Sequence, residues 1–438
     1  MDDPNSAHYL QTVVELGEKR PVTTSRAIYN TQGLKVLDKG VAINAQLYAR
    51  LQQHQFDAPL DDTVSSSTTV TGRQLREAAT ALGAQLPFFA RLMAEPGLRD
   101  LLLDGLEAVP LPPAVAFQLT LACEVRPTLF EHLVRSALLA AWLGYTPLAP
   151  RFDVTMLCAA GLLHDLGMLR IDPVLLAPRQ QLTAEQRRQL YSHPLLSAML
   201  LERHHDYPRT LLRAVLEHQE YLDGSGYPRA LAGDAVSPWG RLLSLAQMAS
   251  AMFGSGGEAP ELRLSVVLRM NPHRYDAGLV QRLTGLLDPR WPADASSPER
   301  LPRPAEVLAD IDRLLADWPT AVLQARGITP ERQARLGLVA VQCAQLRRTL
   351  ADSGAAPQQL ALLAGQPEDG QLQLELSLMA REAAWQLRTL ARTTRRRWQA
   401  EADDMPGSSY AGWLRASEAV FQPLLHTPAA EDDASGEG

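Results

Sequence analysis

The pattern of apolar and polar positions predicts helices over most of the chain. Apolar residues recur every three or four positions in many segments, the spacing that gives a helix one buried face. In the stretch 151–163, for example, Val154, Leu157, Cys158 and Leu162 share one face. Patterns typical of strands are confined to the beginning of the chain. We therefore expect a mainly α protein.

The segment after Pro21 has a pattern typical of short strands. The runs RAIYN, LKVLDKG and VAI are separated by turns at Gly33 and Gly40. This predicts a small β-rich module over residues 1–56, in which the first 20 residues form either a short helix or a disordered arm. A piece of this size buries too little apolar surface to be stable alone, so it should dock on its neighbour.

Composition divides the rest of the chain into further segments. The 438 residues are too many for one hydrophobic core. Residues 57–72 are rich in Ser, Thr and Asp and are predicted to be a linker. A helical domain with leading helices should cover residues 73–290. After a proline-rich break we expect a C-terminal helical bundle or hairpin over residues 305–426, and a disordered acidic tail over 427–438.

Charge and cysteine content narrow the function classes. A net charge of −7 argues against general nucleic-acid binding. The three cysteines lie in apolar helical patterns without zinc-type spacing, which indicates buried thiols in a reducing compartment. The first residues lack the apolar core of a signal peptide, and no apolar run is long enough for a membrane span. We therefore expect a cytoplasmic protein.

Four histidines and one aspartate are candidate metal ligands. His164 and Asp165 end an apolar helix pattern, and His132, His193 and His218 lie in neighbouring helix-like segments. Imidazole and carboxylate are usual ligands of Zn, Mn and Fe. Two ions roughly 3.5–4 Å apart, bridged by a carboxylate, polarise a phosphodiester and activate water. A single such histidine is more often a core or surface residue, but five candidates together favour a metal site.

Residues 128–287 resemble the HD-GYP family of the HD phosphohydrolase superfamily. The resemblance rests on HDLG at 164–167, HP at 193–194, and the pattern H-x-E-x-x-D-G-x-G-Y-P at 218–228. It implies an all-helical domain that hydrolyses the bacterial messenger cyclic di-GMP at a centre of two or three metal ions. Iron or manganese is the expected metal.

The resemblance also implies residue roles. By position, the metal ligands are His132, His164, Asp165, His193 and His218, with Asp165 as the bridge and with Asp165 and His164 as the catalytic pair. A signature loop that shapes the site and contacts substrate or partner is implied as well. Its residues are Asp223, Gly224, Gly226, Tyr227 and Pro228.

The chain departs from the family pattern at four positions. Met168 stands where members usually have Lys, Gln219 where they have a second His, and Gln247 where they have Asp. Thr128 replaces the acidic residue of three-metal members. A thioether cannot bind a phosphate oxygen as a cation does, and an amide oxygen is a neutral, weaker ligand. We expect one ion, two weakly held ions or none, and impaired or absent hydrolysis.

These observations favour a bacterial signalling protein of HD-GYP type, a metal-dependent cyclic di-GMP phosphodiesterase with impaired activity. One alternative is an inactive module that binds cyclic di-GMP or scaffolds a signalling protein. Another is an HD hydrolase of a different nucleotide. A third is that His164 and Asp165 are only a buried hydrogen-bonded pair. The expected partners are cyclic di-GMP or a related nucleotide and a signalling protein, with no nucleic acid.

Overall fold

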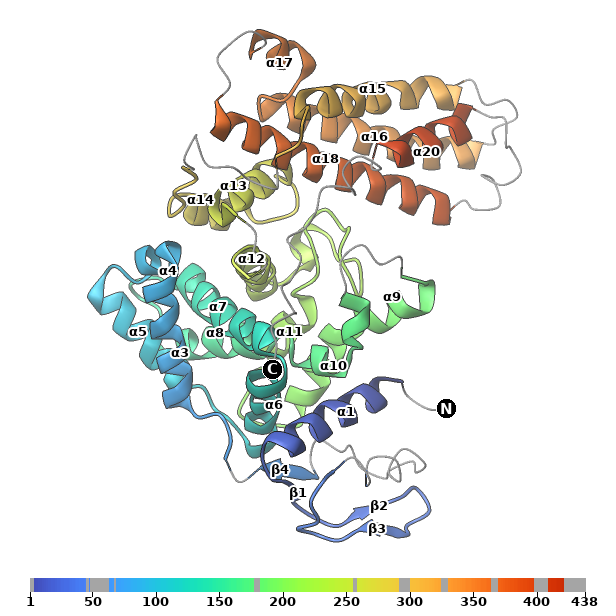
Figure 1. The fold of residues 1–438 in the computed structure, drawn as a ribbon. Helices are drawn as coiled ribbons and strands as arrows, with labels where there is room; N and C mark the ends of the chain where they lie inside the picture. The colour runs from blue at the N-terminus through green and yellow to red at the C-terminus, as the bar shows by residue number, and fades with distance from the viewer. Residues whose placement is uncertain are drawn as a thin grey trace, which may run out of the picture. The chain divides into compact units, whose positions relative to one another are not determined.

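The structure is a computed structural model in which helices dominate, as predicted (Figure 1). It describes residues 4–44, 47, 63–66, 68–176, 182–254, 258–290, 300–323, 330–363, 369–397 and 409–420. The predicted acidic tail lies outside the described residues, as do residues 57–62 and 67 of the predicted linker. The three cysteines are unpaired, in agreement with their scattered positions.

The chain divides into two compact units, which are described separately. Unit 1 consists of Met1–Gly256 and His273–Leu286, and unit 2 consists of Gly257–Pro272 and Leu287–Gly438. Helix α13 (Pro260–Met270) falls within residues 73–290, which we expected to form the helical domain. Its apolar face, which includes Val266, instead joins the hydrophobic core of unit 2.

The beginning of unit 1 is the predicted small module. Strand β1 (Val22–Thr24) pairs antiparallel with β4 (Val64–Ser66), and β2 (Ile28–Tyr29) pairs with β3 (Lys35–Leu37). Strand β4 falls inside the segment that composition predicts to be a linker. Its Val64 is buried, and pairing with β1 satisfies backbone groups that Ser and Thr content alone does not reveal.

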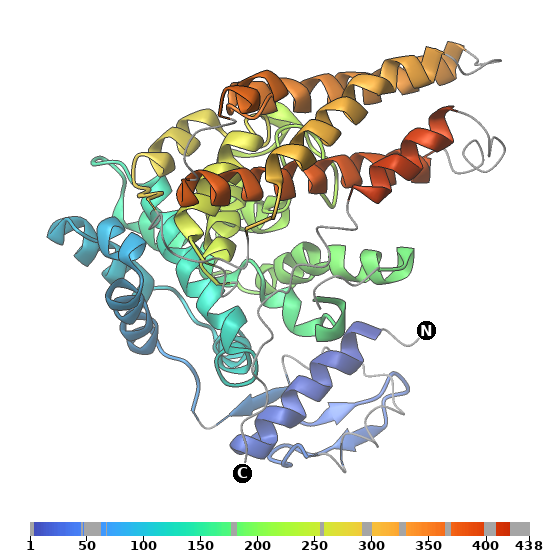
Figure 2. The same ribbon diagram turned by 45° about the horizontal axis from the view of Figure 1, so that its top comes forward.

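Helix α1 (Pro4–Lys19) settles the choice between a helix and a disordered arm. Its buried face includes Tyr9 and Leu16. The amide of Gln118 donates to the Tyr9 hydroxyl at 2.7 Å, and the Arg170 guanidinium lies 4.8 Å from the Tyr9 ring centre. In both ribbon views α1 lies between the small strands and the helices of unit 1 (Figure 1, Figure 2). The module is therefore docked on its neighbour.

The remaining helices of unit 1 form an all-α domain. Helix α7 is its centre and packs against α8 and α12, while α11 packs against α12 and α8. Several helices begin with proline, which suits a first turn because its N–H has no partner there. The α-helices are α3 (Gly72–Gln85), α4 (Pro87–Leu92), α5 (Pro96–Glu107), α6 (Pro113–Val125), α7 (Pro127–Gly144), α8 (Arg151–Leu163), α9 (Ala184–Tyr191), α10 (His193–Glu202), α11 (Arg209–Glu217), α12 (Pro238–Met252) and α14 (Ala277–Thr284). The 3-10 helices are η2 (Leu166–Arg170), η3 (Pro173–Leu176) and η4 (Gly233–Ala235).

Unit 2 is a helical bundle. Its core contains Trp318, whose ring lies 4.5 Å from that of Trp413. Besides α13, its helices are α15 (Pro304–Leu323), α16 (Pro330–Asp352), α17 (Pro357–Leu363), α18 (Gly370–Arg397) and α20 (Ser409–Ala419). Helix α20 was not singled out from the sequence because, among its side chains that the structure describes, only Trp413 and Leu414 are large, apolar and buried.

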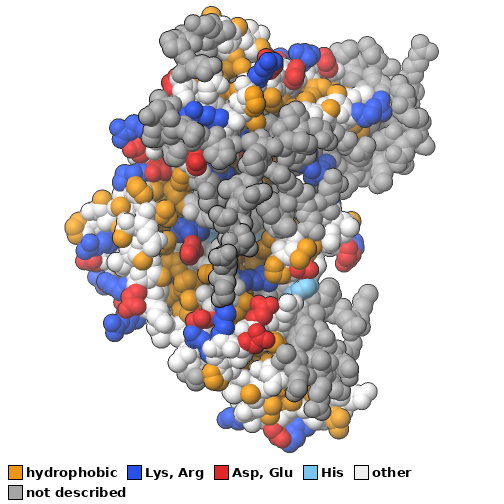
Figure 3. Space-filling model, viewed as in Figure 1, with side chains coloured by type: hydrophobic (Ala, Val, Ile, Leu, Met, Phe, Trp, Pro, Cys, Tyr) orange, Lys and Arg blue, Asp and Glu red, His pale blue; other side chains and the backbone are white. Residues whose placement is uncertain are grey.

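The described surface carries charges of both signs. On the face drawn in Figure 3, acidic and basic side chains are interspersed rather than gathered by sign. Among the described residues, one stretch, Arg151–Arg170, has the length and apolar composition of a membrane span. However, 78% of its most apolar window is buried within the protein, as in a core helix.

Candidate metal centre

The fold brings the five predicted ligand residues together. His132 lies on α7, and His164 is the C-cap residue directly after α8, followed by Asp165. His193 begins α10, and His218 is the C-cap residue directly after α11. His164, His193 and His218 are almost fully buried. Four helices therefore contribute to one cluster in unit 1.

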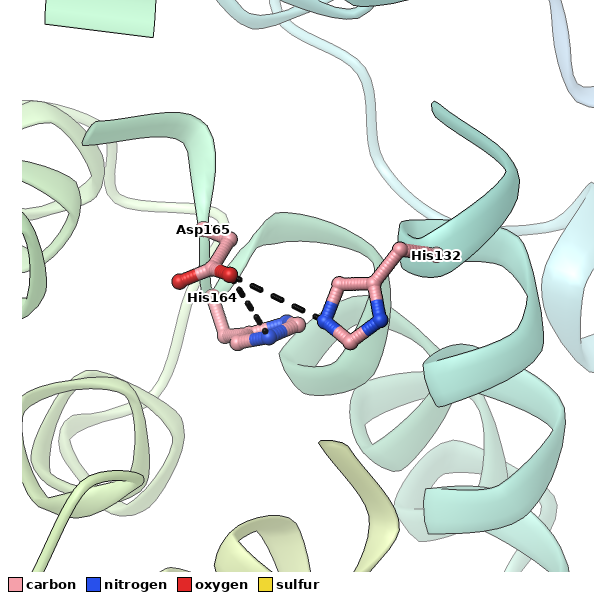
Figure 4. Close-up of side chains that lie close together, drawn as sticks. All are labelled: His132, His164 and Asp165. Atoms are coloured by element: carbon pink, nitrogen blue, oxygen red, sulfur yellow. Dashed lines mark ion pairs between the residues drawn. The ribbon is translucent and has the colours of Figure 1, made fainter. Parts of the chain in front are cut away.

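A close approach of α7 and α8 allows this convergence. A Cβ atom at Gly161 would lie 2.4 Å from the Ser136 carbonyl oxygen and 2.6 Å from the Ala137 nitrogen. Only glycine lets the two backbones come so near. As a result, the rings of His132 and His164 lie 5.3 Å apart (Figure 4).

Asp165 lies at the centre of the cluster. Its Oδ2 atom is 3.7 Å from Nε2 of His132 and 3.4 Å from Nε2 of His164 (Figure 4). Its Oδ1 atom is 3.2 Å from Nε2 of both His193 and His218. The ligand atoms thus form two groups that share Asp165, each of which could hold a metal ion. One carboxylate between two groups has the arrangement of a bridging ligand.

The hydrogen bonds of the other ring nitrogens orient the histidines. In His164, His193 and His218, Nδ1 lies 2.8, 2.7 and 2.7 Å from the backbone carbonyl oxygen three residues earlier. A carbonyl only accepts, so Nδ1 carries the hydrogen and Nε2 presents its lone pair. This is the usual outer-shell arrangement of metal-binding histidines.

Ser250 orients the ring of His132 so that its Nε2 lone pair also points toward the site. Its hydroxyl lies 3.0 Å from the His132 carbonyl oxygen and 3.0 Å from Nδ1 of that ring. A hydroxyl has one hydrogen, so it donates to the carbonyl and accepts from Nδ1–H. Four Nε2 lone pairs therefore face one aspartate. Sequence reasoning missed Ser250, because it lies 118 residues from His132 and no local pattern links them.

The histidine Nε2 atoms and the Asp165 carboxylate oxygens are better suited to bind a divalent cation than to bond to one another. Nε2 of His193 and His218 are only 3.2 Å apart, although both present lone pairs. Nε2 of His164 and Oδ1 of Asp165 are buried without a hydrogen-bond partner in the described structure. A buried polar atom without a partner costs free energy, which a bound cation would offset. In its neutral form His164 has no proton on Nε2 for Asp165, so the two are not a simple hydrogen-bonded pair.

The pKa values of His132, His218 and Asp165 favour the protonation states that bind metal. Burial lowers the pKa of His132 to about 3 and that of His218 to about 4. Burial opposes ionisation of Asp165, but His164 and His193 outweigh it and hold the Asp165 pKa well below its usual value. Near neutral pH an ionised Asp165 therefore lies beside the neutral imidazoles of His132 and His218, so at these three groups metal need not compete with protons.

In the metal-free protein, stability should fall as the pH drops below about 6.5. In the unfolded chain His132 and His218 titrate with the ordinary histidine pKa of 6.5, far above their folded values. The unfolded state then binds more protons, so each group costs up to about 1.4 kcal/mol per pH unit. Urea unfolding of chelated protein at about pH 7.5 and about pH 5.5 measures this effect. A His132→Gln variant should show a shallower decline, and equal wild-type stability at both pH values would contradict the prediction.

Within the predicted loop, Tyr227 reaches the cluster. Its ring lies 6.0 Å from that of His193 and stacks on the half-exposed Tyr191 at 4.0 Å. Tyr191 was not predicted as a site residue. Its position just before the HP segment is the only local signal that points to it.

The other loop residues shape the loop. Asp223 accepts from the Ser225 backbone nitrogen at 2.9 Å and pairs with Arg274 at 3.3 Å, so it is engaged outside the cluster. A Cβ at Gly226 would lie 2.5 Å from the carbonyl oxygen of Gln219, which shows how closely the loop packs on the residues after α11. Gly224 has a backbone φ of 75°, and Pro228 follows a cis peptide bond.

A buried carboxylate anchors this loop. Glu217 accepts, each at 2.8 Å, from Nε of Arg213, Nη2 of Arg229 and the backbone nitrogen of Ser237, which caps α12. It thereby joins the end of α11, the loop and the start of α12. Sequence reasoning missed Glu217, which precedes the His218 motif by one residue.

Glu217→Gln should lower the free energy of unfolding by about 2 kcal/mol, because it weakens charge-assisted hydrogen bonds at a buried site. Burial opposes ionisation of Glu217, but its Arg213 and Ser237 partners outweigh it and lower its pKa below 4.5. Its stabilisation is therefore present above that pH and is lost as the pH falls through the folded pKa. Urea unfolding measures the change. Glu185→Gln, at an exposed ion pair, should change stability by less than about 1 kcal/mol; equal effects would refute the anchoring role.

The four departures from the family pattern lie around the cluster. Gln247 is buried on α12, three residues before Ser250. The backbone oxygen of Gln219 accepts from the nitrogen of Tyr227 at 3.1 Å. The remaining two residues, Thr128 and Met168, line a cavity beside the site.

Comparisons with known proteins agree with this geometry. A family model described as an HD domain matches residues 119–279. A Vibrio cholerae protein named cyclic di-GMP phosphodiesterase is 32% identical over 33% of this chain and 31% of its own length. Cyclic di-GMP phosphodiesterase PdeB of Borreliella burgdorferi is 28% identical over 30% of this chain and 37% of its own. A second Vibrio cholerae protein, 3'3'-cGAMP-specific phosphodiesterase 3, is 32% identical over 23% of this chain and 22% of its own.

The chain thus spans less than two fifths of the length of these curated relatives. A solved HDG"Y"P protein from Bdellovibrio bacteriovorus has a TM-score of 0.33 and 15% identity, covering 49% of this chain and 69% of that one. That likeness is too low to support a conclusion of its own. The helices, the His-Asp cluster and the family match define residues 119–279 as an HD domain. With its HDLG, HP and GYP segments, this domain is similar to those of the HD-GYP family.

Proposed function

We propose that this protein is a cytoplasmic, metal-dependent phosphodiesterase of bacterial signalling that acts on cyclic di-GMP. One observation carries the proposal: four histidine Nε2 lone pairs face the two oxygens of an ionised, central aspartate. The names of the curated relatives support cyclic di-GMP as the substrate.

The proposal assigns a role to each residue of the site. His132 and His164 would hold one metal ion, His193 and His218 would hold another, and Asp165 would contribute to both positions. When bound, iron or manganese supplies Lewis acidity toward the phosphodiester and lowers the pKa of water. Ser250 and the backbone carbonyls fix the rings before substrate arrives. Tyr227, beside His193, closes one side of the site and contacts substrate.

The activity of this centre should be weak. Met168, Gln219 and Gln247 replace a cation, an imidazole and a carboxylate of the family pattern. The proposed ligand set therefore has fewer charged or strongly donating groups for each ion, which lowers metal affinity. One ion, or two weakly held ions, is the expected content.

The test is metal content by elemental analysis of full-length protein purified without chelator. Cyclic di-GMP turnover is then measured on the same sample with added Mn²⁺ or Fe²⁺. One to two metal ions per chain together with turnover is the expected result. Absence of both would overturn the enzymatic proposal, and turnover without metal would overturn the proposed mechanism.

A second candidate is an inactive HD-GYP module that binds cyclic di-GMP or scaffolds a signalling protein. The three substitutions Met168, Gln219 and Gln247 favour it. Nucleotide binding without turnover in the same experiment would select this candidate. Turnover of another cyclic dinucleotide would select a third, an HD hydrolase of different specificity, and the relative named for 3'3'-cGAMP makes that nucleotide the first to assay.

A further inference from the structure

A cavity of about 650 Å³ lies in unit 1 where α1 faces the start of α7 and the 3-10 helices η2 and η3. We call it the α1 pocket. Its volume is in the range of pockets that bind small molecules. Its lining includes His8, Gln11, Glu15, Arg126, Thr128 and Asp172.

The α1 pocket adjoins the candidate metal centre. Thr128 lines it and lies one helical turn before His132 on α7. Met168 lines it as well, and its backbone nitrogen donates to the Asp165 carbonyl oxygen at 2.9 Å. One helical turn rises about 5.4 Å, so a nucleotide with a phosphate at the metal centre can place its base in this pocket.

Helix α1 is a fixed wall of the pocket. The buried Tyr9 ties it to α6, and the His8 ring lies 3.5 Å from Asp172 at the start of η3. At its other end, Arg20 pairs with Glu124. The N-terminal module thus presents α1 to the site in one position.

Opposite charges meet inside the pocket. Arg126 donates to the carbonyl oxygens of Met168 and Ile171 at 2.8 and 3.0 Å, which fixes its guanidinium. Burial lowers the pKa of Arg126, while the nearby Glu15 and Asp172 act to raise it, so both carboxylates lie within electrostatic reach of the guanidinium. A guanidinium has five N–H donors, and two hydrogen bonds to carbonyls leave others for a ligand.

This combination matches the edge of a guanine base. Guanine donates from its N1 and N2 groups, which suits a carboxylate, and accepts at O6 and N7, which suits an arginine. Adenine presents an unprotonated N1, which a carboxylate repels. Two carboxylates in the pocket likewise disfavour a phosphate group, which points to the base as the occupant.

We propose that the α1 pocket binds a guanine base of the cyclic dinucleotide, with Glu15 accepting from N1–H and N2–H and Arg126 donating to O6 and N7. The proposal deepens the proposed function, on which it rests for the nucleotide class. It makes the N-terminal module a determinant of nucleotide specificity.

The test compares binding of cyclic di-GMP and cyclic di-AMP to the full chain, depleted of metal to prevent turnover, by calorimetry. Glu15→Gln should weaken cyclic di-GMP binding about tenfold and leave the weaker cyclic di-AMP binding unchanged, since one recognition pair on a base is lost. The matched control is Glu18→Gln, an exposed acid on the same helix outside the pocket, which should change neither affinity.

Three results would overturn the inference: equal affinity of the wild type for the two nucleotides, no binding of either, or no effect of Glu15→Gln. Metal content and turnover test the proposed function separately. If the protein turns over cyclic di-GMP but Glu15→Gln does not change its affinity for the nucleotide, the assignment of the α1 pocket is wrong and the proposed enzymatic function stands. If guanine-selective binding depends on Glu15 without metal or turnover, the pocket stands and the protein is a nucleotide-binding module.

Discussion

Replacing Asp165 by Asn should abolish metal binding and phosphodiester hydrolysis while leaving the helical fold intact. Both carboxylate oxygens are needed: Oδ2 faces His132 and His164, and Oδ1 faces the other two histidines. An amide has one oxygen and no charge, so it cannot bridge two cations. We expect turnover to fall by more than about 100-fold, beyond what the loss of an outer-shell partner costs.

Elemental analysis and turnover on the same sample measure this effect. The double variant His164→Ala with Asp165→Ala should likewise contain no metal and remain helical by circular dichroism. Asp206→Asn, at an exposed loop position, is the matched control and should keep wild-type metal content. Wild-type metal content in Asp165→Asn would refute the assignment of the site.

The response of stability to added metal separates a metal ligand from a structural aspartate. In chelated protein the lowered pKa of Asp165 means that the fold stabilises its ionised form, so Asp165→Asn should melt lower than the chelated wild type. Added Mn²⁺ should raise the melting temperature of the wild type only, because only the wild type binds it.

Local signals explain why much of this centre could be predicted from the sequence. Pro127 and Gly144 mark the bounds of α7, and the apolar period of α8 stops where His164 and Asp165 begin. The capping box of Thr183 and Gln186 at the start of α9 is a local signal of the same kind, because a cap and its partner stand three residues apart. Because these signals give the ends of each helix, they also predict the position of each candidate ligand within or beside its helix.

Contacts across the chain explain why the rest could not. Periodicity identifies the buried face of α13 but not the core that it joins, which is that of unit 2. For the same reason, periodicity could not predict the contact of Ser250 with His132 or the pairing of β4 with β1. It could not predict the α1 pocket either, since Glu15 and Arg126 are more than 100 residues apart and neither stands in a motif.

Restoring the family residues in the triple variant Met168→Lys, Gln219→His and Gln247→Asp should raise metal affinity and turnover. Gln219 directly follows His218, and Gln247 lies three residues before Ser250, the partner of His132. A carboxylate and an imidazole at these positions would add a charged and a strong neutral ligand. Each should raise metal affinity by at least about tenfold, the smaller of the effects known for groups around a metal.

Single variants separate metal binding from substrate contact. Gln247→Asp and Gln219→His should raise metal content, measured by Mn²⁺ titration. Met168→Lys should lower the KM for cyclic di-GMP with unchanged metal content, because it adds a cation for phosphate at the edge of the α1 pocket. Adding Asp165→Asn to the triple variant is the control and should remove the gain. No gain in the triple variant itself would mean that the loss of these ligands is not what limits activity. The inactive HD-GYP module would then be the favoured candidate.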